Sequence, residues 1–402
     1  MRRAFIRSVG VVSPLGASWP ETWAALLEGG TAIAPIRAFD TTGFPCQSAA
    51  EITDRSHAWS SGRRCMDLAS QAANEAWNAA GRLSAPASRI GIFVGAESGR
   101  PSFPTLVAIG KLGSPERNGA FDHGRFGREG DALGPDLSAS HLSPAAVAST
   151  LAKSFGARGP VRTFSVACAS GSLAISSAAR AIRLGVCDVA IAGGVGADVD
   201  PTCMAGFGLL SALSAKSTAR PFDRDRDGFV LGEGAAMTVL ASEPGGSMVE
   251  VVGAGRSLDA LSLTAPAPDG EGAARAMRAA LAEAKLERVD HVEAHGTGTI
   301  LNDAAEAAAL AQVLGKSDFS VTSSKGALGH WIAGAGALGF ASAHQAIVSG
   351  VIPAIAGLVE PDPELDLPLV MGRFRPSAVS TAMINSFAFG GVNSSIVLAR
   401  VA

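Results

Sequence analysis

Two long segments of this chain are small and apolar almost all the way round a helix. They run from about Ala169 to Leu184 and from about Gly329 to Ser349, and both are rich in Ala and Gly. A helix without a polar face has to be buried, and small side chains let two such helices approach each other closely. The chain therefore has to place further layers of secondary structure around a pair of central helices.

A similar order of elements accompanies each of these helices. The first half opens with an apolar strand, Ala4 to Val12, and the second with another, Met248 to Gly255. Each half then has an amphipathic helix, a strand that ends in glycine, and an apolar strand after the buried helix. In the first half these elements are Met66 to Ala80, Arg89 to Gly95 and Cys187 to Gly194. In the second half they are Gly272 to Leu286, His291 to Gly296 and Thr381 to Gly391, the last with a hairpin into Ser395 to Ala399. Alternating strands and helices imply mostly parallel sheets covered by helices. We predict a layered α/β/α/β/α sandwich of two similar halves, 1–245 and 246–402.

Composition excludes several classes of protein. Of the 402 residues 47% are hydrophobic and 17% are charged, which is typical of a globular chain and not of a disordered one. The net charge of −3 gives no reason to expect nucleic-acid binding. The apolar segment after Met1 is short and interrupted by Arg7, and the stretch from Ile332 to Val359 contains His344 and Pro353, so we expect neither a signal peptide nor a membrane span. We predict a cytoplasmic protein.

The cysteines are odd in number and lack a C-x-x-C pair, so a disulfide scaffold or a zinc site is not expected. They are Cys46, Cys65, Cys168, Cys187 and Cys203. Buried, inert side chains account for four of them. Cys168 differs because of its surroundings, and we predict no metal ion in the protein.

Cys168 lies at a predicted turn between a strand, Val161 to Val166, and a helix that is established by Ser172. The small residues after it permit a sharp bend that pushes the side chain outward, as in the nucleophile elbow of hydrolases. The positive end of a helix dipole and free backbone N–H groups favour the thiolate of a cysteine in this position. The alternative is a small residue packed beneath the helix.

Two histidines adjoin a glycine-rich turn or an apolar helix. His295 ends a strand and precedes Gly-Thr-Gly-Thr, and a strand end that opens into such a turn is where α/β folds build sites. His330 begins the second apolar helix, five residues after Lys325. A buried charge needs a partner, and Asp303 and Glu306 are the nearest in sequence. The alternative for each histidine is a hydrogen-bonded structural role.

Two further segments need an explanation. Asn385 to Asn393 contains Gly390 and Gly391 after Phe389, and glycines there permit backbone N–H groups to form an oxyanion hole, although a plain hairpin is the alternative. The stretch from Gly113 to Ser143 has little periodicity, and we expect a long loop, which in a compact domain is usually functional or interfacial. It carries His123 and His141, for which a solvated surface position is the alternative.

Together these pieces resemble the elongation-type β-ketoacyl-acyl-carrier-protein synthases, which are condensing enzymes of the thiolase superfamily. The resemblance spans nearly the whole chain. It is carried by Ser8 to Gly16, Ser165 to Ser172, Arg220 to Gly234, His295 to Thr299, Lys325 to His330 and Phe389 to Gly391.

The resemblance implies a role for each matching residue. Cys168 would accept an acyl chain from a carrier-protein thioester, and His295 and His330 would donate hydrogen bonds to the enolate formed from a malonyl thioester. The backbone N–H groups of Cys168 and Phe389 would form the oxyanion hole, and Phe389 would also gate the acyl pocket. Lys325 would act on the histidine pair through Glu306. The phosphopantetheine arm would be bound by Thr264, Thr297 and Thr299. The acidic carrier protein would dock on Arg63 and Arg64.

The resemblance also implies a dimer, either of identical subunits or with a chain-length factor, and no cofactor beyond the carrier's phosphopantetheine. Gly298 stands where fatty-acid members often have serine, which leaves a polyene or polyketide role open beside fatty-acid synthesis. A degradative thiolase needs a second cysteine in the C-terminal half, and the last cysteine here is Cys203. Initiating and chalcone-type enzymes have asparagine where His330 stands. A non-catalytic chain-length factor, which lacks the nucleophile, is the remaining alternative.

Overall fold

The computed structural model describes residues 2–53, 61–114, 120–130, 139–315 and 317–401. Within these residues the main sheet has ten strands. They are β1 (Phe5–Val12), β4 (Ile90–Gly95), β5 (Val161–Phe164), β6 (Val189–Ala197), β7 (Glu233–Ala241), β8 (Val249–Leu258), β9 (His291–Glu293), β10 (Ser320–Thr322), β13 (Thr381–Ala388) and β14 (Val392–Arg400). Short two-stranded ribbons join β2 (Ile33–Pro35) to β3 (Ser48–Ala50) and β11 (Val351–Ile352) to β12 (Arg375–Pro376).

The strand order repeats, which confirms the predicted duplication. The order is β5-β4-β6-β7-β1 in the first half and β10-β9-β13-β14-β8 in the second, so corresponding strands occupy corresponding places. The halves meet where Phe5 of β1 pairs with Glu250 of β8. The position of the boundary between domains at residues 245 and 246 stays a prediction.

The prediction of mostly parallel sheets is correct only for the three outer strands of each half. β5, β4 and β6 are parallel, as are β10, β9 and β13. The other two strands of each half run antiparallel to their neighbours. In the second half the reason is local, because β13 and β14 are joined by a tight turn in which Gly390 and Gly391 have φ angles of 85° and 76°.

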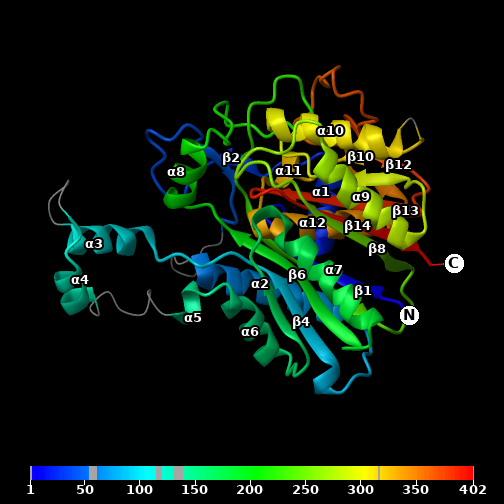
Figure 1. Ribbon diagram of the computed structural model, residues 1–402, viewed down its shortest axis with the longest axis horizontal. Helices are drawn as coiled ribbons and strands as arrows, with labels where there is room; N and C mark the ends of the chain where they lie inside the picture. The colour runs from blue at the N-terminus through cyan, green and yellow to red at the C-terminus, as the bar shows by residue number, and fades with distance from the viewer. Residues whose placement is uncertain (1, 54–60, 115–119, 131–138, 316, 402) are drawn as a thin grey trace.

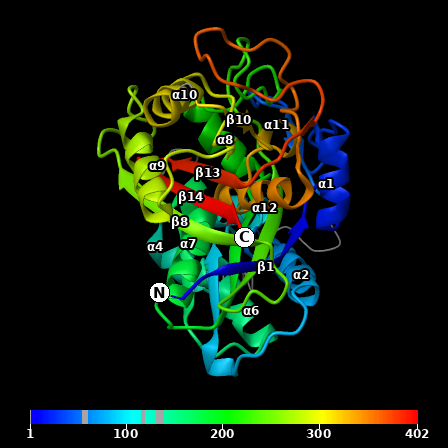
Figure 2. The same cartoon turned by 90° about the vertical axis from the view of Figure 1, so that its right-hand side faces the viewer.

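Helices cover the sheet in layers. They are α1 (Trp19–Leu27), α2 (Ser61–Ala79), α6 (Ala145–Ser154), α7 (Ser170–Arg183), α8 (Pro201–Leu209), α9 (Glu271–Ala284), α10 (Ile300–Leu314), α11 (Lys325–Leu328) and α12 (Ala335–Ser349). α2 and α6 pack on one face of the first half, and α7 on the other. α12 contacts α7, and it also contacts β6 and β7 of the first half and β13 of the second half. α9 packs on β8 and β14 and contacts α10. The two apolar helices thus form the central layer of the predicted five-layer sandwich (Figures 1 and 2).

Glycines permit close contact between the central layer and the strand ends. A Cβ added at Gly95, the last residue of β4, would lie 2.4 Å from the backbone N of Gly171 in α7. A Cβ added at Gly171 would lie 2.9 Å from the carbonyl oxygen of Ala333, just before α12. The strand end, α7 and the start of α12 therefore approach with backbone against backbone.

Replacing Gly95 with alanine should lower the free energy of unfolding by about 1–3 kcal/mol, because the methyl group meets backbone that has no room to move. Urea unfolding of the purified proteins measures this. Gly110→Ala is the matched control, since a Cβ at Gly110 meets nothing within 4 Å. Equal stability of the two variants would contradict the close packing.

The second central helix begins later than predicted. The sequence pattern places its start at Gly329, whereas α12 starts at Ala335. Gly329 and Ile332 have positive φ angles of 66° and 45°, and His330 bonds to Val230 through its backbone N–H, so the chain cannot continue as an α-helix through this segment. As a result His330 lies in an irregular segment just before the helix.

The segment predicted as a long loop is partly helical. α4 (His123–Glu129) and α5 (Ala139–Leu142) lie within it, and α3 (Phe103–Gly113) ends at its first residue, while residues 115–119 and 131–138 lie outside the described residues. Side chains at the N-caps explain two of these helices, since Ser102 accepts the N–H of Thr105 and Asp122 that of Arg125. Figure 1 shows α3 and α4 standing away from the body of the protein, and we call residues 103–114 and 120–129 the α3–α4 arm.

Candidate active site

The nucleophile turn has the form that the sequence predicts. Cys168 lies in a 3-10 turn, Ala167–Ala169, between the end of β5 and the start of α7. Ala167 adopts a left-handed backbone conformation with φ 45°, which is unfavourable for a residue with a Cβ. The sharp bend directs the Cys168 side chain into a pocket, where it is 6% exposed.

Both histidines lie beside Cys168 and line the same pocket. His330 places Nε2 3.0 Å from Sγ of Cys168, and the ring centroids of His295 and His330 are 5.5 Å apart. The thiol and one ring nitrogen of each histidine lie within 4.8 Å of one another. The fold thus brings together three residues from segments far apart in the sequence.

A backbone contact fixes the proton on His330. The N–H of Ile332 donates to Nδ1 of His330 over 3.1 Å, so in the neutral ring Nδ1 is an acceptor and the proton is on Nε2. Burial, and then the positive charge of Lys325, hold the pKa of His330 well below its usual range, and the pKa of His295 is lowered well below its usual range for the same reasons. At neutral pH His330 is therefore a neutral hydrogen-bond donor that points at the thiol.

Burial has a larger effect on the pKa of the Cys168 thiol than the backbone N–H groups have. It raises the pKa of the thiol to about 12, against the lowering effects of Lys325 and of the backbone N–H groups of Cys168 and Phe389. The backbone N–H groups favour the thiolate, as the sequence predicts, but the opposing effect of burial on the pKa of the thiol is larger. The same N–H groups nevertheless point at the sulfur, and Phe389 lies on the turn where the sequence predicts them.

Alkylation of Cys168 by iodoacetamide should accelerate about tenfold for each pH unit between pH 7 and 9.5, because the reactive thiolate fraction grows in that proportion below a pKa of about 12. Peptide-resolved mass spectrometry measures the rate at each pH. A rate that levels off near pH 8 would show instead that the helix end holds the thiolate.

Lys325 and Glu306 hold the peptide group that follows His295. Nζ of Lys325 donates to the carbonyl oxygen of His295 over 2.5 Å, and the Glu306 carboxylate accepts the N–H groups of His295 (2.9 Å) and Gly296 (2.8 Å). Burial raises the pKa of Glu306 to about 7. The predicted pair thus acts on the backbone of His295 from two sides, and the charge of Glu306 also raises the pKa of Lys325, against the larger lowering effect of burial.

Two polar residues of this region were missed by the sequence analysis. Glu293 is buried in β9 and is the first of the carboxylates whose charge favours protonated Lys325. Asn385 donates its side-chain amide to Glu306 over 3.1 Å. A charged residue within the apolar strand Val292-Glu293-Ala294 was a signal that could have identified Glu293.

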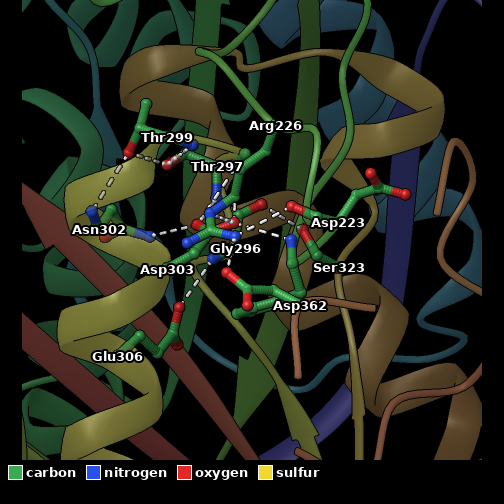
Figure 3. A network of polar contacts seen from close by, with 12 residues as sticks. Asp223, Arg226, Gly296, Thr297, Thr299, Asn302, Asp303, Glu306, Ser323 and Asp362 are labelled. Carbon is green, nitrogen blue, oxygen red and sulfur yellow. Dashed lines mark hydrogen bonds and ion pairs between the residues drawn. The ribbon is translucent and has the colours of Figure 1, made fainter. Parts of the chain in front are cut away.

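Asp303 organises the loop that follows His295, as Figure 3 shows. Its carboxylate accepts the backbone N–H groups of Thr297 and Gly298 at 3.1–3.2 Å, and that of Phe222 at 2.8 Å. Arg226 lies 3.9 Å from the same carboxylate and forms an ion pair of 2.6 Å with Asp362. This network connects the run from Arg220 to Gly234 to the loop that follows His295.

The pocket is a cavity of about 320 Å³ that leads to Cys168. All three threonines predicted to bind an arm line it, and the hydroxyl groups of Thr297 and Thr299 are 3.0 Å apart. Thr264 is exposed. Phe389 also lines the pocket and packs near Phe207, with ring centroids 6.2 Å apart.

The predicted basic docking pair does not stay together. Arg64 points inward and donates two hydrogen bonds of 2.7 Å to the buried carboxylate of Glu233. It donates a third, of 2.9 Å, to the carbonyl oxygen of Ile52. A guanidinium used in this way is a structural group, so the docking prediction for Arg64 is wrong. Arg63 is exposed on α2.

No helix in the described parts of the chain is long and apolar enough to cross a membrane. Among the described residues, Cys168, His295 and His330 form the cluster whose spacing suits a metal ion. The 3.0 Å contact between His330 and the thiol is a hydrogen-bond distance, and the absence of a metal stays a prediction.

A duplicated α/β sandwich with a cysteine and two histidines at the end of a pocket defines a thiol-dependent condensing enzyme of the thiolase-like class. The chain matches the N-terminal domain model of β-ketoacyl synthases over residues 1–244 and the C-terminal domain model over residues 248–358. It belongs to the β-ketoacyl synthase family.

Similar proteins cover the full chain. It is 32% identical to the 3-oxoacyl-acyl-carrier-protein synthase 2 of Synechocystis sp., over 99% of this chain and 98% of that protein. It is 35% identical to nodulation protein E of Rhizobium sp. strain N33, with 100% of both chains covered. Among solved structures, the ishigamide ketosynthase/chain length factor is similar with a TM-score of 0.87, 31% identity and full coverage of both chains.

Proposed function

We propose that this protein is a β-ketoacyl-acyl-carrier-protein synthase, which joins an acyl chain held on Cys168 to a malonyl unit carried by acyl carrier protein. The observation that carries the proposal is the meeting of the Cys168 thiol, a histidine N–H donor and two backbone N–H groups in the lining of one pocket. Full-length relatives named as 3-oxoacyl synthases support it.

In the first step the sulfur of Cys168 attacks the carbonyl carbon of an acyl thioester. The proton of the thiol leaves as the new carbon–sulfur bond forms, and the carrier's phosphopantetheine thiol departs with a proton. The backbone N–H groups of Cys168 and Phe389 are placed to stabilise the oxyanion of the tetrahedral intermediate. Because burial disfavours the thiolate, these donors and His330 have to offset its cost during the reaction.

In the second step a malonyl thioester enters the same pocket. Its carbon–carbon bond to the carboxylate breaks, CO₂ leaves, and the electron pair forms an enolate whose oxygen is stabilised by hydrogen bonds from His330 and His295. The enolate carbon attacks the acyl thioester, and the Cys168 sulfur leaves. A neutral His330 with its proton on Nε2 suits this donor role, since it needs no change of protonation.

Thr264, Thr297 and Thr299 suit an arm with amide groups, because their hydroxyl groups lie along the pocket that leads to the thiol. We assign them to the phosphopantetheine arm of the carrier protein. The arm delivers the substrates, and the proposed chemistry needs no other cofactor.

Exposed apolar side chains accompany the lining of this pocket. Six large aliphatic residues that line it or lie within two positions of a lining residue in the sequence are at least 50% exposed, and we call them the apolar rim: Leu209, Leu210, Leu261, Leu263, Ile300 and Leu301. Exposed apolar patches of this kind mark interaction sites. We propose that the apolar rim and Arg63 of α2 both contact the acyl carrier protein.

The α3–α4 arm suits a second subunit. Phe103 and Phe121 are 49% and 41% exposed on an arm that stands away from the body (Figure 1). We propose a dimer, either of two copies of this chain or of this chain with a chain-length-factor subunit. The second form is suggested by the similar structure named as the ishigamide ketosynthase/chain length factor. The pathway is fatty-acid synthesis or a specialised polyene or polyketide route, and the cytoplasmic location stays a prediction from the sequence.

The test is to incubate the purified protein with acyl- and malonyl-carrier protein, with and without a candidate partner subunit. We expect an acyl adduct on the Cys168 peptide by mass spectrometry, release of CO₂ and a β-ketoacyl product. Absence of both the adduct and CO₂ with every partner would support the non-catalytic chain-length-factor alternative.

A further inference from the structure

Glu97 reaches the nucleophile turn from the neighbouring strand. β4 and β5 are parallel neighbours with Gly95 opposite Phe164, and the N–H of Ala96 donates to the carbonyl oxygen of Phe164 over 3.0 Å. The absence of a side chain at Gly95 lets this strand end lie against the start of α7. Glu97, two residues further on, therefore lies beside the residues that precede Cys168.

The carboxylate of Glu97 contacts three residues of the turn. Oε1 accepts the N–H of Ala167 at 2.9 Å, and Oε2 accepts the hydroxyl of Ser165 at 2.7 Å. The Ser170 hydroxyl lies 3.3 Å from Oε1, but its one proton has a nearer acceptor in the carbonyl oxygen of Ala167 at 2.7 Å. One side chain thus contacts the turn before and after Cys168.

Ala167 is the residue of the turn that needs such support. Its φ of 45° is unfavourable for an L-residue, and its N–H has the Glu97 carboxylate as its acceptor. Ser170 adds a second contact, because its hydroxyl accepts the N–H of Val166 over 2.8 Å. Without Glu97 the backbone before Cys168 loses the acceptor that fits this conformation.

The charge of Glu97 has a separate effect. It opposes ionisation of the neighbouring thiol and so adds to the raised pKa of Cys168, of which burial is the largest cause. A neutral amide at the same position offers an oxygen acceptor without this effect. The holding contact and the charge are therefore separable by substitution.

We propose that Glu97 is a positioning residue of the condensing site, which fixes the turn that carries Cys168 and makes the thiol less reactive towards small electrophiles in the resting protein. The inference rests on the proposed role of Cys168 as the nucleophile. Glu97 contacts the turn, and its effect on the chemistry is exerted through the position and charge environment of Cys168.

The test compares Glu97→Gln and Glu97→Ala in two measurements that need no thioester substrate. The first is the rate of Cys168 alkylation by iodoacetamide from pH 7 to 9.5. The second is amide hydrogen exchange of the peptide over residues 165–170. We expect E97Q to alkylate at least threefold faster at every pH with unchanged exchange, and E97A to exchange at least tenfold faster in this peptide.

Glu287→Gln is the matched control, an exposed carboxylate between α9 and β9, and should behave as wild type in both measurements. Exchange in E97A equal to wild type would overturn the holding role, and alkylation of E97Q equal to wild type would overturn the charge effect. If E97A cannot be purified, Ser165→Ala, which removes one donor to the carboxylate, should raise exchange of the same peptide at least threefold, and unchanged exchange would overturn the holding role. Failure of the wild-type protein to load acyl groups would contradict the proposed function and leave both measurements on Glu97 decisive.

Discussion

Replacing Cys168 with alanine should abolish covalent acyl loading and lower condensation at least about 10⁴-fold, the loss typical of removing a catalytic nucleophile. The side chain is the one thiol that lies in hydrogen-bond contact with a histidine among the described residues. Intact-mass measurement after incubation with acyl-carrier protein reports loading, and chromatographic detection of the β-ketoacyl product reports condensation.

Cys203→Ala is the matched control for that experiment. Cys203 is partly exposed on α8, its sulfur contacts Asp198 at 3.8 Å, and it lies outside the lining of the pocket. Its variant should load and condense within about threefold of wild type, since it touches neither reacting group. An acyl adduct that persists in C168A would refute the assignment of the nucleophile.

Replacing His330 with alanine should lower malonyl decarboxylation by about 10²–10³-fold, the loss expected for one preorganised donor to a developing oxyanion. Acyl loading should fall less, within about tenfold, because the backbone N–H groups of Cys168 and Phe389 remain. CO₂ release from malonyl-carrier protein measures the first effect, and the rate of appearance of the Cys168 adduct measures the second.

His330→Asn and His123→Ala complete this experiment. Asparagine keeps an N–H donor in the side chain, so H330N should recover part of the decarboxylation lost in H330A. His123 lies at the start of α4 on the α3–α4 arm, and H123A should decarboxylate as wild type. Equal decarboxylation by H330A and wild type would exclude the donor role of His330.

The elements of the fold were predictable because their patterns are local. The pattern along the chain predicts burial of the central helices, which have small apolar residues all round, and of the apolar strands that end in glycine. This prediction does not require knowledge of which elements pack together. The start of α12 was predicted wrongly because Gly329 and Ile332 take positive φ angles, and an apolar pattern does not distinguish such a segment from helix. The antiparallel strands of each half depend on pairing, which periodicity does not report.

The site was predictable in its reacting groups and less so in their support. Cys168, His295 and His330 stand in short runs that carry the family resemblance, and the structure brings them together. Arg64 was assigned to a partner because its position in the chain matches a docking residue, yet Glu233 lies where it can bind the guanidinium. Nothing local to Arg64 or to Glu97 shows which side chain lies opposite.

The duplicated layers, the buried central helices and the identity of the thiol and imidazole groups could all be predicted from the order of residues along the chain. Three features follow from the folded chain alone: Lys325 and Glu306 share the His295 peptide, Glu97 contacts the nucleophile turn, and burial raises the pKa of the Cys168 thiol. The physical reason is that burial follows from the pattern of neighbours along the chain. Hydrogen-bond partners and ionisation depend on distances between residues that folding brings together from separate segments.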